Sequence, residues 1–518
     1  MPVNIKEMIV VLALGALAFA LGKETALNFM DESDFKRRRN VWLLLSAVAF
    51  LSPSFWIFVL IAAPALYIGG RKDTNPLAFY LILMNVIPAM GIQIPTAGLG
   101  INQLFELDIL RLLSFCVLIP AALRIRKAAN PEGPRGLQGT DLLLLCYGLL
   151  TVVLYVAPDD PNQLYSHTSP TNILRQAFLF VTDAYVLYYV ASRSCNTRRA
   201  IVDALAAFCL ACAIMSLIAI FESVKHWLLY TDLYKRWGGG QLELQYLFRA
   251  GLLRAVSSTG NAIILGYLLA VALGFWLYLQ SHLERVGPKV AVAALLWLGL
   301  LASFSRGPLL AAILMYFAYA AFRPGGASRL LKAAIAFIVV AAVVLASPAG
   351  DKLTATLPFM GGHVAQGTLT YREQLLARSW QLIQAHPYFG DQEALSKMQD
   401  LRQGQGIIDI VNTYVEVTLF YGFIGLAVFL AFIMSALTKT LAVVRSPLQP
   451  YPDWPLLGAN LAACMIGVLL MFADCSFISE CATTFFALIG IALAYFRVSS
   501  RPASDIAQAS PAPTPEPG

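Results

Sequence analysis

The chain has 518 residues, of which 58% are hydrophobic and only 13% are charged. Soluble domains carry about 25% charged residues, so this composition excludes an ordinary soluble protein. Apolar runs recur along the whole sequence, and each is near the roughly 20 residues that a helix needs to cross a bilayer. Backbone groups find no water in the hydrocarbon, so these runs must be helices. The sequence therefore predicts an all-α polytopic membrane protein.

The net charge of +7 does not indicate a nucleic-acid partner, because the basic residues form short clusters between the apolar runs rather than one patch. The eight cysteines form no disulfide framework. Cys209 and Cys212 have CxxC spacing, but they lie within an apolar run, where packing is the better explanation. Cys475 and Cys481 flank a short turn, and we predict no disulfide between them.

The first apolar run covers Met8 to Leu21 and is interpreted as an uncleaved first helix rather than a signal peptide. The basic residues Lys36 to Arg39 follow and predict a cytoplasmic loop. The run from Val41 to Gly70 is too long for one upright span and contains Pro53, so it predicts two short helices.

Later apolar runs bring the expected total to roughly 14 spans. They cover Pro76–Gly91, Ile109–Ile125, Asp141–Val156, Asn172–Ala191, Ala200–Phe221, Ala262–Leu279, Lys289–Phe304, Pro308–Phe322, Leu330–Ala346, Asn412–Leu437, Pro455–Phe472 and Cys481–Phe496.

The loops between these runs sort by charge, and the basic ones are expected on the cytoplasmic side. They are Arg124–Arg135, Arg193–Arg199, His282–Lys289, Arg323–Lys332 and Lys439–Arg445. The other side, which is the periplasm in a bacterium, then receives the loops Ala157–Thr171, Glu222–Ser258, Ser305–Gly307, Ala349–Val411 and Ala473–Glu480.

One long polar interval interrupts the apolar pattern and divides the chain. Residues 349–411 are predicted to form a large, partly helical periplasmic subdomain between an N-terminal bundle, 1–348, and C-terminal helices, 412–498. Residues 499–518 are rich in Pro, Ala and Ser and predict a disordered cytoplasmic tail. The charges of the interval indicate either a solvated loop or a chemical site at the mouth of a membrane protein.

Three arginines stand at the periplasmic ends of predicted spans. Arg254 precedes the Ala262–Leu279 helix, Arg306 follows Ser305 in a tight turn, and Arg372 begins a loop segment. A single arginine there is usually a snorkelling or capping residue. Three on one face favour a pyrophosphate site, because guanidinium groups bind phosphate oxygens two at a time and stabilise a leaving pyrophosphate without a metal.

Several groups near the re-entry into apolar sequence are able to transfer a proton. Asn412 and Glu416 are four residues apart, which predicts one helix face, and Tyr414 lies between them. The other candidates are His363, His386, Asp391 and Asp409. There is no nucleotide-binding glycine loop, no HExxH motif and no dense carboxylate cluster, so we predict neither a metal nor another cofactor.

Three motifs in order resemble the O-antigen ligase and Wzy-type polymerase superfamily of bacterial envelope glycosyltransferases. They are the Ser305–Gly307 turn, the segment Tyr371-Arg372 through His386-Pro387-Tyr388-Phe389-Gly390, and Asn412–Glu416 followed by Tyr421–Gly425. The resemblance covers roughly Arg254 to Phe496 and implies a GT-C-like membrane fold. It also implies an undecaprenyl-pyrophosphate-linked oligosaccharide donor, transfer at the periplasmic face of the inner membrane, and pyrophosphate binding by Arg254, Arg306 and Arg372.

The family's ligases end this loop in a His-Asn-type motif whose histidine is proposed to activate the acceptor hydroxyl. That position here is Val411, so the candidate catalytic residues are Asp409, Glu416 and His363, with Ser305, His386, Asn412 and Tyr414 in support.

These features predict a polymerase of lipid-linked repeat units in Wzy-dependent exopolysaccharide synthesis, working with membrane lipids and a polysaccharide co-polymerase. An O-antigen ligase or protein O-oligosaccharyltransferase is the nearest alternative, because it differs only in acceptor. A polysaccharide flippase is an alternative of another class. It predicts charges in the bilayer midplane and often an internal repeat, whereas the charges here gather on one face. A structural scaffold would leave the arginines unexplained.

Overall fold

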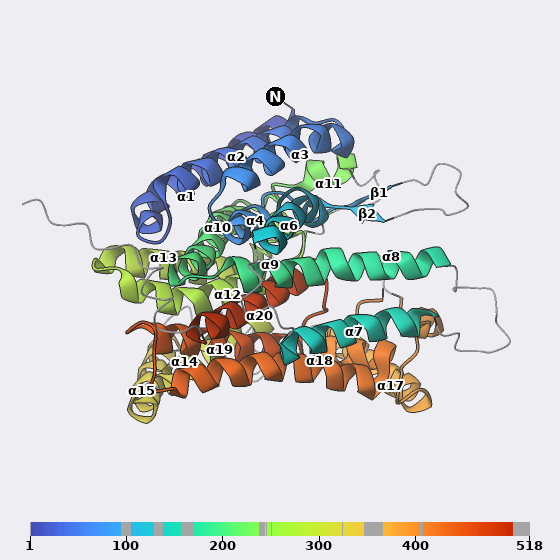
Figure 1. The fold of residues 1–518 in the computed structure, drawn as a ribbon. Helices are drawn as coiled ribbons and strands as arrows, with labels where there is room; N and C mark the ends of the chain where they lie inside the picture. The colour runs from blue at the N-terminus through green and yellow to red at the C-terminus, as the bar shows by residue number, and fades with distance from the viewer. Residues whose placement is uncertain are drawn as a thin grey trace, which may run out of the picture.

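The computed structural model describes residues 2–94, 105–128, 138–156, 170–237, 244, 246–249, 251–323, 325–345, 366–402 and 408–500 (Figure 1). The candidate His363 lies outside these residues. The described chain is helical except for two short antiparallel pairs of strands. This confirms the prediction of an all-α polytopic fold.

Of the four N-terminal helices, the first three lie together along one edge of the molecule, and the fourth is buried beside α10 (Arg198–Lys225) (Figure 1). They are α1 (Val3–Leu27), α2 (Glu32–Leu51), α3 (Phe55–Lys72) and α4 (Pro76–Leu83). The predicted interruption around Pro53 separates α2 from α3. The basic residues Lys36 to Arg39 belong to α2 rather than to a loop, and their cytoplasmic location stays a prediction. The Arg38 side chain is fully buried, where it forms ion pairs with Asp73 at 2.8 Å and Asp203 at 2.6 Å.

The next elements are a pair of strands followed by several helices. They are β1 (Ile92–Gln93), β2 (Glu106–Leu107), α5 (Ile109–Leu113), η1 (Ser114–Leu118), α6 (Ile119–Ala128), α7 (Gly139–Val156), α8 (Pro170–Phe180), η2 (Val181–Tyr185), α9 (Val186–Ser194), α10 (Arg198–Lys225) and α11 (Thr231–Trp237). Both η1 and η2 are π-helical turns within otherwise α-helical segments.

The remaining elements begin with a second strand pair. They are β3 (Phe248–Arg249), β4 (Leu252–Leu253), η3 (Ser257–Thr259), α12 (Ala262–Leu279), η4 (Gln280–His282), α13 (Val286–Ala302), α14 (Arg306–Phe322), α15 (Gly326–Leu345), α17 (Gln366–Ala385), η6 (Ala394–Leu401), α18 (Thr413–Arg445), α19 (Trp454–Met471) and α20 (Ser479–Ser499).

Eight helices of the described chain are long and apolar enough to cross a membrane. They begin at Val3, Phe55, Ile173, Arg198, Ala262, Thr413, Trp454 and Ser479, and three further apolar helices are shorter. The total of about 14 spans and the GT-C-like fold stay predictions. The helices α10, α12, α19 and α20 are the most enclosed and form the centre, whereas α1 and α3 keep most of their apolar surface on the outside. Helices that are apolar all round belong in such a centre.

Some of the loops that were assigned to the same side of the membrane by their charge contact one another in the structure. Asp453 pairs with Arg198 at 2.8 Å and with His282 at 3.0 Å, which joins two of the predicted cytoplasmic loops. Arg193 and Arg497 lie near the C-terminal ends of α9 and α20, and both form an ion pair with Asp141 near the start of α7. The predicted periplasmic loops gather around a different set of contacts, and these form the candidate site.

The polar interval has a small apolar core of its own. It combines residues of α17 and η6 with the start of α18: Leu375, Ile383, Ala394, Met398, Ile410 and Leu419. The segment is thereby fixed against the end of α18, and Arg372 lies within helix α17 rather than in a loop.

Candidate functional site

The turn between α13 and α14 is held by two arginines. Arg254 donates from Nε to the Ser303 carbonyl at 3.0 Å and from a terminal nitrogen to the Ser305 hydroxyl at 3.2 Å. Arg249 donates to the Phe304 carbonyl at 2.9 Å. A guanidinium carries five N–H donors, so each arginine keeps donors for a ligand.

The loop that carries Arg254 is held in place by a buried carboxylate. Glu222, in the last turn of α10, accepts hydrogen bonds from the backbone N–H groups of Val256 at 3.1 Å and Ser257 at 2.8 Å. Ser257 has a φ of +50°, which costs energy for a residue with a side chain. The carboxylate stabilises this strained turn and therefore fixes the position of Arg254.

Arg306 and Arg372 complete the cluster. Arg306 is the first residue of α14, and among the described residues its guanidinium has no hydrogen-bond or ion-pair partner. Arg372 pairs with Asp474, in the connection between α19 and α20. The start of α14 packs against the same carboxylate, because a Cβ added at Gly307 would lie 2.5 Å from an Asp474 oxygen.

The electrostatics of the cluster show that its positive charges converge. Burial, together with the charges of Arg249 and Arg372, lowers the pKa of Arg254 to about 10, although Asp474 opposes this. Burial and the charges of Arg306 and Arg372 lower the pKa of Arg249. A guanidinium keeps its positive charge in proteins. Four cations facing one carboxylate form a site for an anion; we call these five residues the arginine cluster.

The structure therefore brings together Arg254, Arg306 and Arg372, the three arginines singled out from the sequence, with Ser305 beside them. Arg249 was missed. It lies in the same predicted periplasmic loop as Arg254, and that location was the only signal. The β3–β4 hairpin brings it to the turn: Phe248 pairs with Leu253 across the strands.

Glu416 and Asp409 both fix the connection between α19 and α20. A Glu416 carboxylate oxygen accepts a hydrogen bond from the Phe477 N–H at 3.1 Å. An Asp409 oxygen accepts one from the Ser476 hydroxyl at 2.6 Å. Asp474 of the arginine cluster lies in the same connection, so these carboxylates and the cluster are positioned by one short segment.

Asn412 and Tyr414 have structural contacts. The Asn412 side chain accepts hydrogen bonds from the N–H groups of Tyr414 and Val415, and so caps α18. Asn412 lies one turn before Glu416, whose N–H donates to the Asn412 carbonyl at 2.9 Å, but the Asn412 amide is used to cap the helix. The Tyr414 hydroxyl donates to the Leu469 carbonyl at 2.6 Å, which ties α18 to α19.

His386 belongs to a segment that packs into a break in α18. Gly422 interrupts the helix with a φ of +64°. The freed N–H groups of Phe423 and Ile424 donate to the carbonyls of Pro387 at 2.8 Å and Tyr388 at 3.3 Å. The two motifs at 386–390 and 421–425 are therefore the two halves of one backbone junction.

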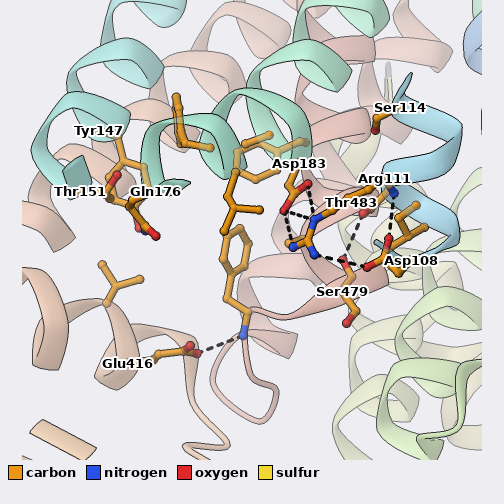
Figure 2. Close-up of a pocket in the computed structure, with 18 of the residues that line it drawn as sticks. Asp108, Arg111, Ser114, Tyr147, Thr151, Gln176, Asp183, Glu416, Ser479 and Thr483 are labelled. Carbon is orange, nitrogen blue, oxygen red and sulfur yellow. Dashed lines mark hydrogen bonds and ion pairs between the residues drawn. The ribbon is translucent and has the colours of Figure 1, made fainter. Parts of the chain in front are cut away.

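A cavity of about 390 Å³ lies on the other side of the α19–α20 connection (Figure 2). Glu416 and Phe477 form part of its wall. Arg111 and Asp183 face each other across another part, with nitrogen–oxygen distances of 2.8 and 3.1 Å. Sequence reasoning missed this pair. Asp183 lies within the candidate span Ile173–Ser194, so the charges do not all gather on the loops.

Within the described ranges, no three His, Cys, Asp or Glu side chains are grouped as a metal site requires. Cys475 and Cys481 lie with their sulfur atoms 3.5 Å apart as free thiols.

Residues 291–430 match the O-antigen ligase family model. The match confirms the resemblance to the O-antigen ligase and Wzy-type superfamily and indicates an enzyme of the ligase or polymerase type. No curated protein matches the chain significantly.

The part that matches the O-antigen ligase family contains Arg306, Arg372, Glu416 and the junction at Gly422. Arg254 and the α19–α20 connection lie outside it. The tertiary structure thus joins the matched segment to residues on both sides of it in the sequence.

Proposed function

We propose that the protein is a polymerase of lipid-linked oligosaccharide repeat units. It transfers a glycan from undecaprenyl pyrophosphate to a sugar hydroxyl of an acceptor, at the periplasmic face of the bacterial inner membrane. A polysaccharide co-polymerase is the expected protein partner. The observation that carries the proposal is the arginine cluster, which gathers four arginines near one partly exposed carboxylate and leaves Arg306 unpaired among the described residues.

The cluster suits the charge that develops in the reaction. The acceptor oxygen attacks the anomeric carbon, the bond from that carbon to the phosphate oxygen breaks, and undecaprenyl pyrophosphate leaves with the electron pair. Guanidinium groups fixed by backbone contacts stabilise the growing negative charge without having to reorganise. The acceptor proton passes to Glu416, which the Phe477 N–H holds at the edge of the cavity.

The assay that tests this function supplies the purified protein with an undecaprenyl-pyrophosphate-linked repeat unit from its own host and separates the products on a gel. A ladder of repeats establishes a polymerase. One-step transfer that requires added lipid A–core or a protein acceptor makes the protein a ligase. If the repeat unit stays intact with every acceptor, the transferase proposal is wrong, and a flipping assay is the next experiment.

Replacement Glu416→Gln is expected to lower the turnover rate by about 10²–10⁴-fold, because the amide keeps the hydrogen bond from Phe477 but accepts no proton. Initial rates at saturating repeat unit measure this. Asp409→Asn is the matched control: it keeps the Ser476 contact and should change the rate by less than about tenfold. A larger loss in Asp409→Asn than in Glu416→Gln would assign the base to Asp409.

Replacement Asp474→Asn should tighten the binding of inorganic pyrophosphate by about two- to fivefold. The substitution removes the negative charge that competes with the ligand, while the amide oxygen still accepts from Arg372. The effect is modest because both side chains are partly exposed. Calorimetric titration measures it, with the exposed Asp400→Asn as control. Weaker binding in Asp474→Asn would show that the carboxylate mainly orients Arg372.

A further inference from the structure

The cavity beside Glu416 has the chemistry of a ligand site of its own. Polar groups are concentrated on the wall formed by α5, η2 and the start of α20 (Figure 2). They include Asp108, Arg111, Asp183 and Thr483. Aromatic rings of α8, α18 and the α19–α20 connection form much of the rest. Apolar walls with a few fixed polar groups are typical of small-molecule sites.

The polar wall is rigid before any ligand arrives. The Nε of Arg111 donates to both carboxylate oxygens of Asp183 at 3.1 Å. The terminal nitrogen Nη2 of Arg111 donates to one of these oxygens at 2.8 Å. Asp108 caps α5 by accepting from the Arg111 backbone N–H at 2.8 Å. Both carboxylates keep free lone pairs for hydroxyl donors. A fixed wall of this kind binds without the entropy cost of ordering long side chains.

The π-helical turns are a second, independent indication. Both such turns in the described part of the chain contribute to this cavity: η1 through Ser114 and η2 through Asp183 and Ala184. A π-helical turn has poorer hydrogen bonding than an α-helix, and it occurs frequently at functional sites. Here the two turns lie on different helices and face the same space.

The charge of the cavity selects against anions. Asp108, Asp183 and Glu416 provide three carboxylates, and among the described residues of the lining Arg111 is the only cation. A phosphate or a uronic acid would be repelled, whereas sugar hydroxyls donate to carboxylates and the C–H faces of sugar rings pack on aromatic side chains. The pyrophosphate belongs to the arginine cluster, and this cavity fits an uncharged sugar.

The cavity and the arginine cluster are close along the chain. Asp474 belongs to the cluster, Phe477 lines the cavity, and three residues span at most about 11 Å. A sugar in the cavity would therefore lie near the anomeric carbon of a glycan whose pyrophosphate is held by the cluster.

We propose that this cavity binds the uncharged terminal sugar of the acceptor glycan and directs its attacking hydroxyl toward Glu416. The acceptor role rests on the proposed function, while the binding of an uncharged sugar is tested without it.

The experiment measures the binding of methyl glycosides of neutral hexoses, N-acetylhexosamines and uronic acids by saturation-transfer NMR. The full-length protein is held in lipid nanodiscs, because maltoside detergents would present a competing sugar. Thr151→Val removes a hydroxyl of the cavity wall, and Asp183→Asn removes one of its charges. Thr440→Val is the matched control, because Thr440 is a buried threonine outside the cavity lining, and its hydroxyl bonds to a carbonyl of its own helix, that of Ala436.

We expect at least one neutral glycoside to bind, with affinity reduced about three- to tenfold in Thr151→Val and more in Asp183→Asn, and unchanged in Thr440→Val. We expect the corresponding uronic acid to bind at least about tenfold more weakly. Equal binding of the neutral and acidic glycosides, or affinity that is unaffected by both cavity variants, would overturn the proposal.

Arg306→Ala separates this inference from the proposed function. The variant should bind the neutral glycoside normally even though it transfers glycan on the order of 10²–10³-fold more slowly. A protein that polymerises repeat units but binds no neutral glycoside in the cavity would refute the acceptor site alone. Binding that needs the cavity residues, in a protein without transferase activity, would refute the proposed function alone.

Discussion

Replacement of Arg306 by alanine is expected to lower the rate of glycan transfer by on the order of 10²–10³-fold, the usual cost of removing one fixed donor from a developing oxyanion. Among the residues that the structure describes, Arg306 makes no ion pair or hydrogen bond, so its removal breaks no structural contact. The variant should therefore insert and melt like the parent protein, and the loss should appear in the turnover rate.

Arg306→Lys sharpens this test. Lysine keeps the charge but binds phosphate oxygens as a point charge, so it should recover only part of the activity. Arg445→Ala removes an exposed arginine at the far end of α18 and serves as the control. Initial rates from the repeat-unit assay and melting temperatures in nanodiscs are compared for all variants. Full activity in Arg306→Ala would remove this residue from the pyrophosphate site.

Replacement Gly422→Ala should destabilise the protein by about 3 kcal/mol or more. The φ of +64° with a ψ of −171° is open almost only to glycine. A Cβ there would also lie 2.2 Å from the carbonyl carbon and oxygen of Tyr388, which are backbone atoms and cannot rotate away. The substitution would open the junction between α18 and the 386–390 segment. The expected readout is a lower melting temperature and less folded protein after extraction.

Gly325→Ala is the matched control for the backbone conformation alone. Gly325 has a φ of +75°, but a Cβ there meets nothing within 4 Å, so its cost should be about 1 kcal/mol. The additional loss in Gly422→Ala then reports the contact with Tyr388 together with the ψ of −171°. Equal melting temperatures for both would contradict the tight packing of the junction.

The amino-acid sequence by itself determined the class of fold. Long apolar runs must become helices in a bilayer, Pro53 separates α2 from α3, and two of the basic loops meet at Asp453. Each of these outcomes depends on composition within one segment. The same local rules nominated Arg254, Arg306 and Arg372, because arginines at span ends are visible without knowing their neighbours.

Only the tertiary structure decided which residues meet. Arg249 joins the cluster because a hairpin places it beside the turn at Phe304, and no local motif marks it. Arg111 and Asp183 are far apart in sequence, and helix packing makes them one wall of a cavity. Asn412 uses its amide to cap α18. Such contacts depend on long-range packing between helices, which local periodicity and charge do not encode.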